Sequence, residues 1–184
     1  MRPIPRTQAG SGHAGARQPS VLLTGLLLGI GITGAIDEAV FHQVLQWHTL
    51  YWGTDAHGRV LSDGLFHLVS TGVLVWGALR VWQMPEDWRH SRRQALLAAI
   101  LMGAGGFNLY DGLVQHLLLH LHLVNEFVCP NPQANNSVAT CPADTPFEVA
   151  WLVVAAAVLA AGSFWWQARQ RRPSASGGGQ GRVS

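Results

Sequence analysis

Four long apolar stretches limit the folds open to this chain more than any other feature. They lie at 21–47, 62–82, 94–123 and 147–167. Each offers the roughly 20 residues that an α-helix needs to cross a hydrocarbon core about 30 Å thick. Charged residues make up only 12% of the chain, about half of their usual share in a soluble protein. We therefore expect an all-α integral membrane protein built as a four-helix bundle in a lipid bilayer.

The basic residues indicate how the helices are oriented. All 12 are arginines, and all but Arg59 fall in three groups: an N-terminal arm, the segment between the second and third stretches, and a C-terminal tail. Because cationic segments stay on the cytoplasmic side, we expect both termini to be cytoplasmic and the loops at 48–61 and 124–146 to lie outside. Arginines segregated in this way around apolar sequence are typical of a membrane protein and not of a nucleic-acid binder.

The two ends of the chain and one loop differ in composition from the apolar core. Residues 1–19 and 169–184 are rich in Gly, Ser, Pro and Arg, which predicts disordered tails around a membrane domain at 20–168. Cys129 and Cys141 are the only cysteines, and both lie in the long outer loop. A disulfide suits an oxidising exterior, and a pair of thiolate metal ligands is the alternative.

A string of Gly, Asp and His residues occurs twice, 74 positions apart, as from Asp37 to Asp111. It holds most of the titratable groups that lie within apolar sequence. Such self-similarity indicates two repeated two-helix units, related by a quasi-two-fold axis along the membrane normal. The matched pairs are Gly29 and Gly103, Gly31 and Gly105, Asp37 and Asp111, His42 and His116, and His48 and His122.

Straight helices would bring these groups to one depth in the membrane. At 1.5 Å per residue, Asp37 and Asp111 lie about 24 Å above the inner ends of their helices. The second and fourth stretches run in the opposite direction, so their first residues reach the same level. One layer near the outer face is then expected to hold Asp37, Glu38, His42, Asp63, His67, Asp111, His116 and Glu148, with His48, His120 and His122 just above it.

Ionisable groups at such depth are costly and are usually functional. Imidazole suits copper, zinc and iron, and carboxylates serve either as ligands or as acceptors that orient imidazoles. We therefore predict a transition-metal site near the outer face. On a straight helix Asp37 and His48 lie about 16 Å apart, which predicts that they cannot share one ion. The candidate site residues are His42, His116, His67, Asp37, Asp111, Asp63, His48, His122 and His120.

Three other interpretations remain open. The polar layer can be an inert lock between helices in a structural or assembly protein. His42 can face His116 across a haem, since a two-fold repeat supplies axial pairs. The layer can also relay protons or ions, although 21–34 and 96–107 offer almost no polar residue to continue a path inward. The sequence leaves open which metal is bound, whether a reaction is catalysed and which partners are involved.

The strings GIGITGAIDEAVFHQVLQWH and GAGGFNLYDGLVQHLLLHLH, with DGLFH between them, resemble a bacterial family of four-span membrane proteins filed as domain of unknown function 2243. The resemblance covers about residues 20–168 and implies a bacterial inner or plasma membrane protein. It supplies no activity, although it implies metal-handling or cytochrome oxidase assembly proteins of the membrane as partners. Glu38 stands where the family has a glycine, as at Gly112, which leaves its place in the site open.

Overall fold

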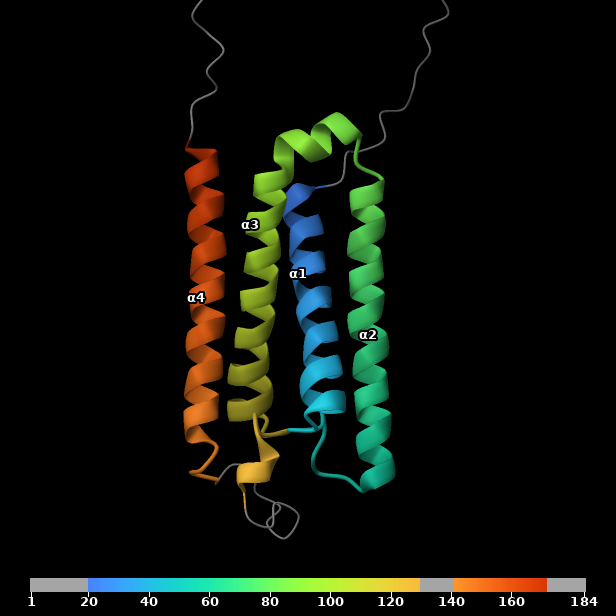
Figure 1. The fold of residues 1–184 in the computed structure, drawn as a ribbon, viewed down its shortest axis with the longest axis vertical. Coiled ribbons are helices and arrows are strands. Elements are labelled where there is room, and N and C mark those ends of the chain that lie inside the picture. The colour runs from blue at the N-terminus through green and yellow to red at the C-terminus, as the bar shows by residue number, and fades with distance from the viewer. Residues whose placement is uncertain (1–19, 130–140, 172–184) are drawn as a thin grey trace, which may run out of the picture.

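The computed structural model describes residues 20–129 and 141–171, and these ranges form an all-α molecule (Figure 1). The predicted tail at 1–19 lies outside the described residues, as do 172–184 of the second tail and 130–140 of the outer loop. The long helices are α1 (Val21–Asp37), α2 (Ala56–Trp82), α3 (Glu86–Tyr110) and α4 (Thr145–Gln170).

Two of these helices continue in a wider form. A π-helix, η1 (Glu38–Val44), extends α1, and a second, η2 (Asp111–Leu118), extends α3. Counted with these extensions, four helices in the described part of the chain are long and apolar enough to cross a membrane. The prediction of an all-α membrane bundle is confirmed. The candidate spans are Val21–Val44, Ala56–Trp82, Glu86–Leu118 and Thr145–Gln170.

α1 and α3 form the central pair, with α2 packed on α1 and α4 packed on α3. Glycines permit the close approach of the central pair. A Cβ atom on Gly29 would collide with the Ile100 carbonyl, and one on Gly103 would collide with the backbone of Leu26. Small residues that let helix backbones meet are a common basis of packing in membranes. The tight contact of α1 and α3 therefore fixes the two halves of the molecule against each other.

α1 begins at Val21, as predicted, but α2 and α3 begin earlier than the apolar pattern predicts. α2 starts at Ala56, where the Asp55 carboxylate accepts a hydrogen bond from Gly58 N at 2.8 Å, and α3 starts at Glu86. Polar first turns can extend a helix beyond the hydrocarbon core, which an apolar pattern does not register. The described ends of α1 and α4 lie at the same end of the bundle as the turn between α2 and α3 (Figure 1).

The first and third predicted helices end earlier than expected, and both end in the same way. In the last turn an N–H bonds to the carbonyl five residues back, as in a π-helix. The residue after that N–H then adopts a positive φ, a left-handed conformation that terminates helices. The bonds are Leu45 N to Val40 O and Leu119 N to Val114 O, both 2.8 Å, and the positive φ values are 52° at Gln46 and 50° at His120.

Beyond these ends the chain turns back toward the bundle, and the two reversed segments bind each other. Trp52 N donates to the carbonyl of Leu121 at 2.9 Å, and Glu126 N donates to the carbonyl of Trp47 at 2.7 Å. The two bonds are counterparts under the repeat, because Glu126 stands 74 residues after Trp52 and Leu121 stands 74 residues after Trp47. The residues that follow each π-helix are therefore held close to the end of that helix by the other reversed segment.

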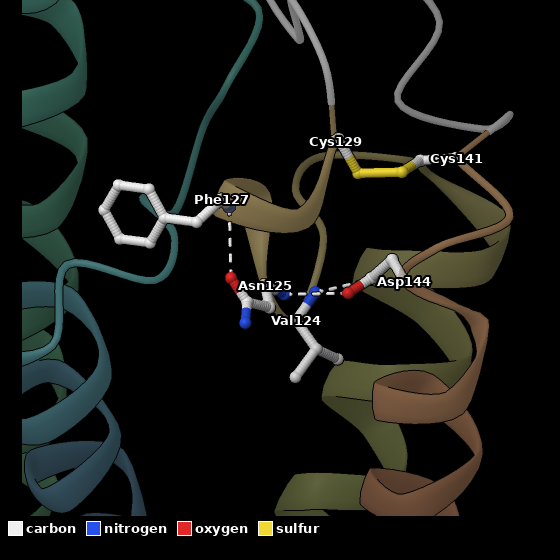
Figure 2. Close-up of a disulfide and its surroundings, with 6 residues drawn as sticks. All are labelled: Val124, Asn125, Phe127, Cys129, Cys141 and Asp144. Carbon is white, nitrogen blue, oxygen red and sulfur yellow. Dashed lines mark hydrogen bonds between the residues drawn. A yellow bond between two sulfur atoms is a disulfide. The ribbon is translucent and has the colours of Figure 1, made fainter.

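A disulfide between Cys129 and Cys141 closes the opposite end of the bundle from the described termini (Figures 1 and 2). The expected disulfide is confirmed, and the alternative of two thiolate ligands is wrong because neither thiol is free. Beside it the Asp144 carboxylate accepts hydrogen bonds from Val124 N at 3.2 Å and from Asn125 N at 2.9 Å. These hydrogen bonds attach the start of α4 to the second reversed segment. We name this end of the bundle the disulfide end.

Candidate metal centre

The first half of the chain brings an aspartate and two histidines together at the disulfide end. His42 Nε2 lies 3.5 Å from Asp37 Oδ2, and His48 Nε2 lies 3.7 Å from Asp37 Oδ1. The two imidazole rings stand nearly perpendicular, with their centroids 4.5 Å apart. All three side chains are buried. We name Asp37, His42 and His48 the first triad.

The corresponding residues of the second half form the same arrangement. His116 Nε2 lies 3.1 Å from Asp111 Oδ2, and His122 Nε2 lies 3.8 Å from Asp111 Oδ1. The two Nε2 atoms are 2.9 Å apart. These side chains are also buried, His122 to 1% exposure. We name Asp111, His116 and His122 the second triad.

Backbone carbonyls fix one histidine of each triad, and each carbonyl comes from the other half of the chain. His48 Nδ1 lies 2.9 Å from Val124 O, and His122 Nδ1 lies 3.1 Å from Leu50 O. A carbonyl oxygen can only accept, so the hydrogen bond requires a proton on Nδ1 in both rings. In a neutral imidazole the Nε2 atom then presents a lone pair to its triad.

Carboxylates from the outer helices hold the other two histidines. His42 Nδ1 lies 3.0 Å from Asp63 Oδ1 on α2, and His116 Nδ1 lies 2.8 Å from Glu148 Oε1 on α4. Metal-binding histidines commonly donate their second ring N–H to a carboxylate, which sets the tautomer and raises ligand basicity. All four imidazoles therefore point Nε2 toward an aspartate and Nδ1 toward an acceptor.

This arrangement concentrates electron-rich atoms without donors. Several of these buried atoms have no hydrogen-bond partner among the described residues, and an unsatisfied buried polar atom costs about 1–3 kcal/mol. In the second triad, two Nε2 atoms at 2.9 Å repel each other unless a proton or a metal ion lies between them. The atoms without a partner include Asp37 Oδ1, His42 Nε2, His48 Nε2 and Asp111 Oδ2.

His122 lies beyond the end of the third span, and its environment favours the neutral ring. Burial, followed by the neighbouring histidines, lowers the pKa of His122 well below its ordinary value. A neutral imidazole is the form that binds a metal ion. The ring thus needs no deprotonation to act as a ligand near neutral pH.

The two triads adjoin each other. The ring centroids of His48 and His122 are 4.8 Å apart, and each of these rings also lies near the far histidine, at 6.3 Å for His42 and His122 and 6.2 Å for His48 and His116. Four imidazoles and two aspartates therefore form one buried cluster between the ends of α1 and α3. The two paired reversed segments supply its carbonyl contacts, each to the histidine of the other half.

Six of the nine candidate residues from the sequence meet in the triads, and a seventh, Asp63, holds His42. His67 does not join them, since its side chain is exposed on α2. His120 is exposed as well, and its Nδ1 lies 3.0 Å from the carbonyl of His116. Metal binding itself stays a prediction at this point.

The prediction that Asp37 and His48 cannot share an ion is wrong. It assumed a straight helix through His48, whereas the helix ends after Val44 and the chain reverses at Gln46. The reversal carries His48 back beneath the helix end, to within 3.7 Å of Asp37. The same reversal at His120 returns the second histidine of the other half.

Sequence reasoning assigned no specific role to two of the acids. Glu148 was placed in the polar layer only by depth, yet it is the counterpart of Asp63 by contact. Those two residues lie 85 positions apart, so the 74-residue repeat could not pair them. Asp144, which holds Val124 and Asn125 by their N–H groups, was not singled out. Its position just before Thr145-Pro146, at a helix start, was the available signal.

The two halves differ around His42. The Glu38 side chain is buried to 2% exposure, and its Oε2 lies 3.4 Å from His42 Nδ1. Gln43 Nε2 donates to the other oxygen of Glu38 at 2.8 Å. Gly112 occupies the corresponding position in the second half. Glu38, His42 and Asp63 thus form a third group with metal-ligand geometry, which the second half does not reproduce.

The fold and the cluster define a four-span integral membrane protein with a buried His/Asp centre at one end. The sequence model of a family described as "Predicted membrane protein (DUF2243)" matches residues 24–169. The chain belongs to this family, as its repeated strings indicate, and both triads lie within the matched region. Comparison with curated proteins and with solved structures found no match.

Proposed function

We propose that this protein binds transition-metal ions at the two triads, one ion at each. The observation that carries the proposal is the convergence of four buried Nε2 atoms on two buried aspartates, with every Nδ1 within 3.1 Å of an oxygen atom. Two histidines and one carboxylate leave coordination positions open, as in catalytic zinc sites and non-haem iron(II) sites. The triads contain no sulfur ligand, which favours zinc, iron or cupric copper over cuprous copper.

The closeness of the triads supports a two-ion centre. An adjacent pair of ions would supply Lewis acidity or electron transfer to a molecule bound between them. The chain contributes rigid placement, because His48 and His122 are held by carbonyls and His42 and His116 by carboxylates. The central contact of α1 and α3 keeps the two halves of the site at a fixed separation.

The alternatives account for less of this geometry. An inert lock would pair its donors and acceptors, whereas buried atoms of this cluster, Asp37 Oδ1 and His48 Nε2 among them, have no hydrogen-bond partner in the described part of the chain. A haem needs a clear axial nitrogen, but His116 Nε2 lies 3.1 Å from Asp111 and 2.9 Å from His122. A proton shared by His116 and His122 explains the 2.9 Å contact, so a proton-binding cluster is the second candidate function.

Elemental analysis of the protein purified in detergent tests the proposal. Wild type should retain a stoichiometric transition metal, and His48→Ala and His122→Ala should lose the ion of their triad. His67→Ala is the control, because this histidine is exposed on α2 outside the triads, and it should keep the metal. A folded wild type that takes up no copper, zinc or iron after loading would contradict metal binding and favour the proton cluster. A Soret band in the same sample would establish haem instead.

We place the centre near the outer face of a bacterial inner membrane, with both termini cytoplasmic. The support is the position of the described arginines of these groups, which lie toward the end opposite the disulfide, and cationic ends stay inside. They are Arg80, Arg89, Arg92, Arg93, Arg169 and Arg171. A reporter active only in the periplasm, fused after Arg171, should be inactive in this topology. Activity of that fusion would reverse the orientation. Metal supply to an oxidase, which the family resemblance implies, suits a site near the outer face.

A further inference from the structure

A pocket of about 450 Å³ opens on the flank of the bundle, beside the first triad and between α1, α3 and α4. Ile36 and Val154 line it and are 53% and 59% exposed. Both belong to the candidate membrane spans, so at that depth the medium around them is lipid. The pocket therefore opens toward the bilayer. Other lining residues are Thr33, Phe41, Trp47, Asn108, Phe147 and Trp151.

Aromatic rings form much of the wall, and they lie directly against the histidines. Phe41 lies 5.4 Å from Trp151 and 5.5 Å from Trp47, measured between ring centroids. Phe41 also stacks on His48 at 6.2 Å with only 8° between the planes, and Trp151 lies 6.0 Å from His116. A molecule in the pocket would thus be separated from the histidines His48 and His116 by one aromatic ring.

Two polar groups line the otherwise apolar space. Asp37 belongs to both the pocket and the first triad. Asn108 Oδ1 is buried and has no hydrogen-bond partner in the part of the chain that the structure describes. Both offer acceptor oxygens, so they complement a ligand that carries hydroxyl donors.

The corresponding space in the other half is filled. Phe107 stands 74 positions after Thr33, and Gly34 stands 74 positions before Asn108. Phe107 stacks on Phe66 with ring centroids 6.2 Å apart and 7° between the planes. Both rings come within 3.7 Å of the place where a Cβ on Gly34 would stand. The chain thus packs this position with rings on one side and keeps it open on the other.

We propose that this pocket binds a bilayer-soluble molecule with a flat, hydroxyl-bearing ring and an apolar tail, of the hydroquinone type. Flat rings stack on aromatic walls, hydroxyl groups donate to Asn108 and Asp37, and the tail leaves past Ile36 and Val154 into lipid. The pocket volume falls in the range of about 300–1,000 Å³ that small-molecule sites occupy. Binding stands on the pocket alone, whereas a role for the molecule as substrate of the metal centre rests on the proposed function.

Saturable binding of 2-decylhydroquinone to the full chain in lipid nanodiscs, measured against empty nanodiscs, tests this proposal. Thr33→Phe introduces the ring that the other half already carries and should weaken binding at least tenfold. Ile32→Phe places the same ring one residue away, outside the pocket lining, and should leave binding unchanged. Equal binding by wild type and T33F would overturn the proposal.

Two further measurements keep the test decisive. Asn108→Leu removes the unpaired acceptor and should also weaken binding. This variant replaces T33F in the test if T33F does not fold. Unchanged affinity in N108L would overturn the assigned hydroxyl contact. 1-Dodecanol has a tail and no ring, and displacement of the probe by dodecanol at equal concentration would overturn recognition of the ring.

Metal content measured on the same samples separates this inference from the proposed function. Saturable binding that T33F abolishes, in protein that takes up no metal, would contradict the metal centre and leave the pocket standing. Stoichiometric metal without saturable probe binding would contradict the pocket alone.

Discussion

At the scale of single residues, the decisive feature of the centre is what each imidazole does with Nδ1. His48 and His122 donate to carbonyls, and His42 and His116 face the carboxylates of Asp63 and Glu148. The sequence predicted the six triad residues, because Gly, Asp and His recur there at fixed spacing. It did not predict Val124 and Leu50, since any residue type can supply a backbone carbonyl.

The carboxylate behind His116 should tune metal affinity without being required for it. In Glu148→Gln the amide keeps the size of the side chain but weakens the charge-assisted bond to Nδ1. We expect a 10- to 100-fold loss of affinity for the ion of the second triad, as for other partners of ligating histidines. Competition with a chromophoric chelator measures it. Unchanged affinity in E148Q would remove this carboxylate from the description of the site.

Glu126 should make the stability of the disulfide end depend on pH. Burial raises the pKa of Glu126 to about 8, so the folded protein keeps this proton at pH values where the unfolded chain has released it. Between the ordinary glutamate value and about 8, stability therefore falls as pH rises. The melting temperature of wild type should drop from pH 5 to pH 8, and Glu126→Gln should reduce the drop. Equal slopes for the two proteins would contradict the shift.

At the scale of elements, the two π-helices and their left-handed ends bring the centre together. The apolar pattern predicted where helices cross the membrane, but it could not predict where α1 changes to η1. That change depends on hydrogen bonds to carbonyls five residues back and on a reversal that the partner segment stabilises. A straight helix therefore predicted a separation of about 16 Å between Asp37 and His48, whereas the structure brings them within 3.7 Å.

Replacing the left-handed residue tests whether the reversal builds the site. Gln46→Val places a β-branched residue at a φ of 52°. This left-handed conformation costs a residue other than glycine about 1–2 kcal/mol, and β-branched residues tolerate it least. We expect lower thermal stability and weaker metal binding by the first triad. Gln46→Gly is the matched control and should keep both. Full metal binding by Q46V would show that His48 does not depend on this turn.

At the scale of the whole molecule, the disulfide end closes the fold around the centre. Cys129 and Cys141 enclose a loop with a sequence separation of 12, and Asp144 fastens Val124, whose carbonyl holds His48. Composition predicted both the bundle and the covalent bond between these cysteines. Composition did not predict the asymmetry between the halves. Phe66 fills a space beside Gly34, and that space exists only once the helices have packed.

Removing the disulfide should loosen the centre as well as the loop. Cys129→Ser with Cys141→Ser should lower stability by about 3 kcal/mol, the usual effect for a loop of similar size. Metal release to a chelator should accelerate in the double variant, and wild type treated with reductant should behave alike. Asp144→Asn keeps the covalent bond and should speed release to a smaller extent. Release rates equal to wild type in the double variant would separate the disulfide from the site.

The crossed hydrogen bonds have a consequence for the biosynthesis of the protein. His48 needs the carbonyl of Val124, which the ribosome adds 76 residues later, after the whole of α3 and η2. The first triad therefore stays incomplete while the first hairpin alone has entered the membrane. Both triads acquire their final geometry in one late event, when the two hairpins associate. Under the proposed function, a nascent chain therefore has no finished ion site before its second half is in place.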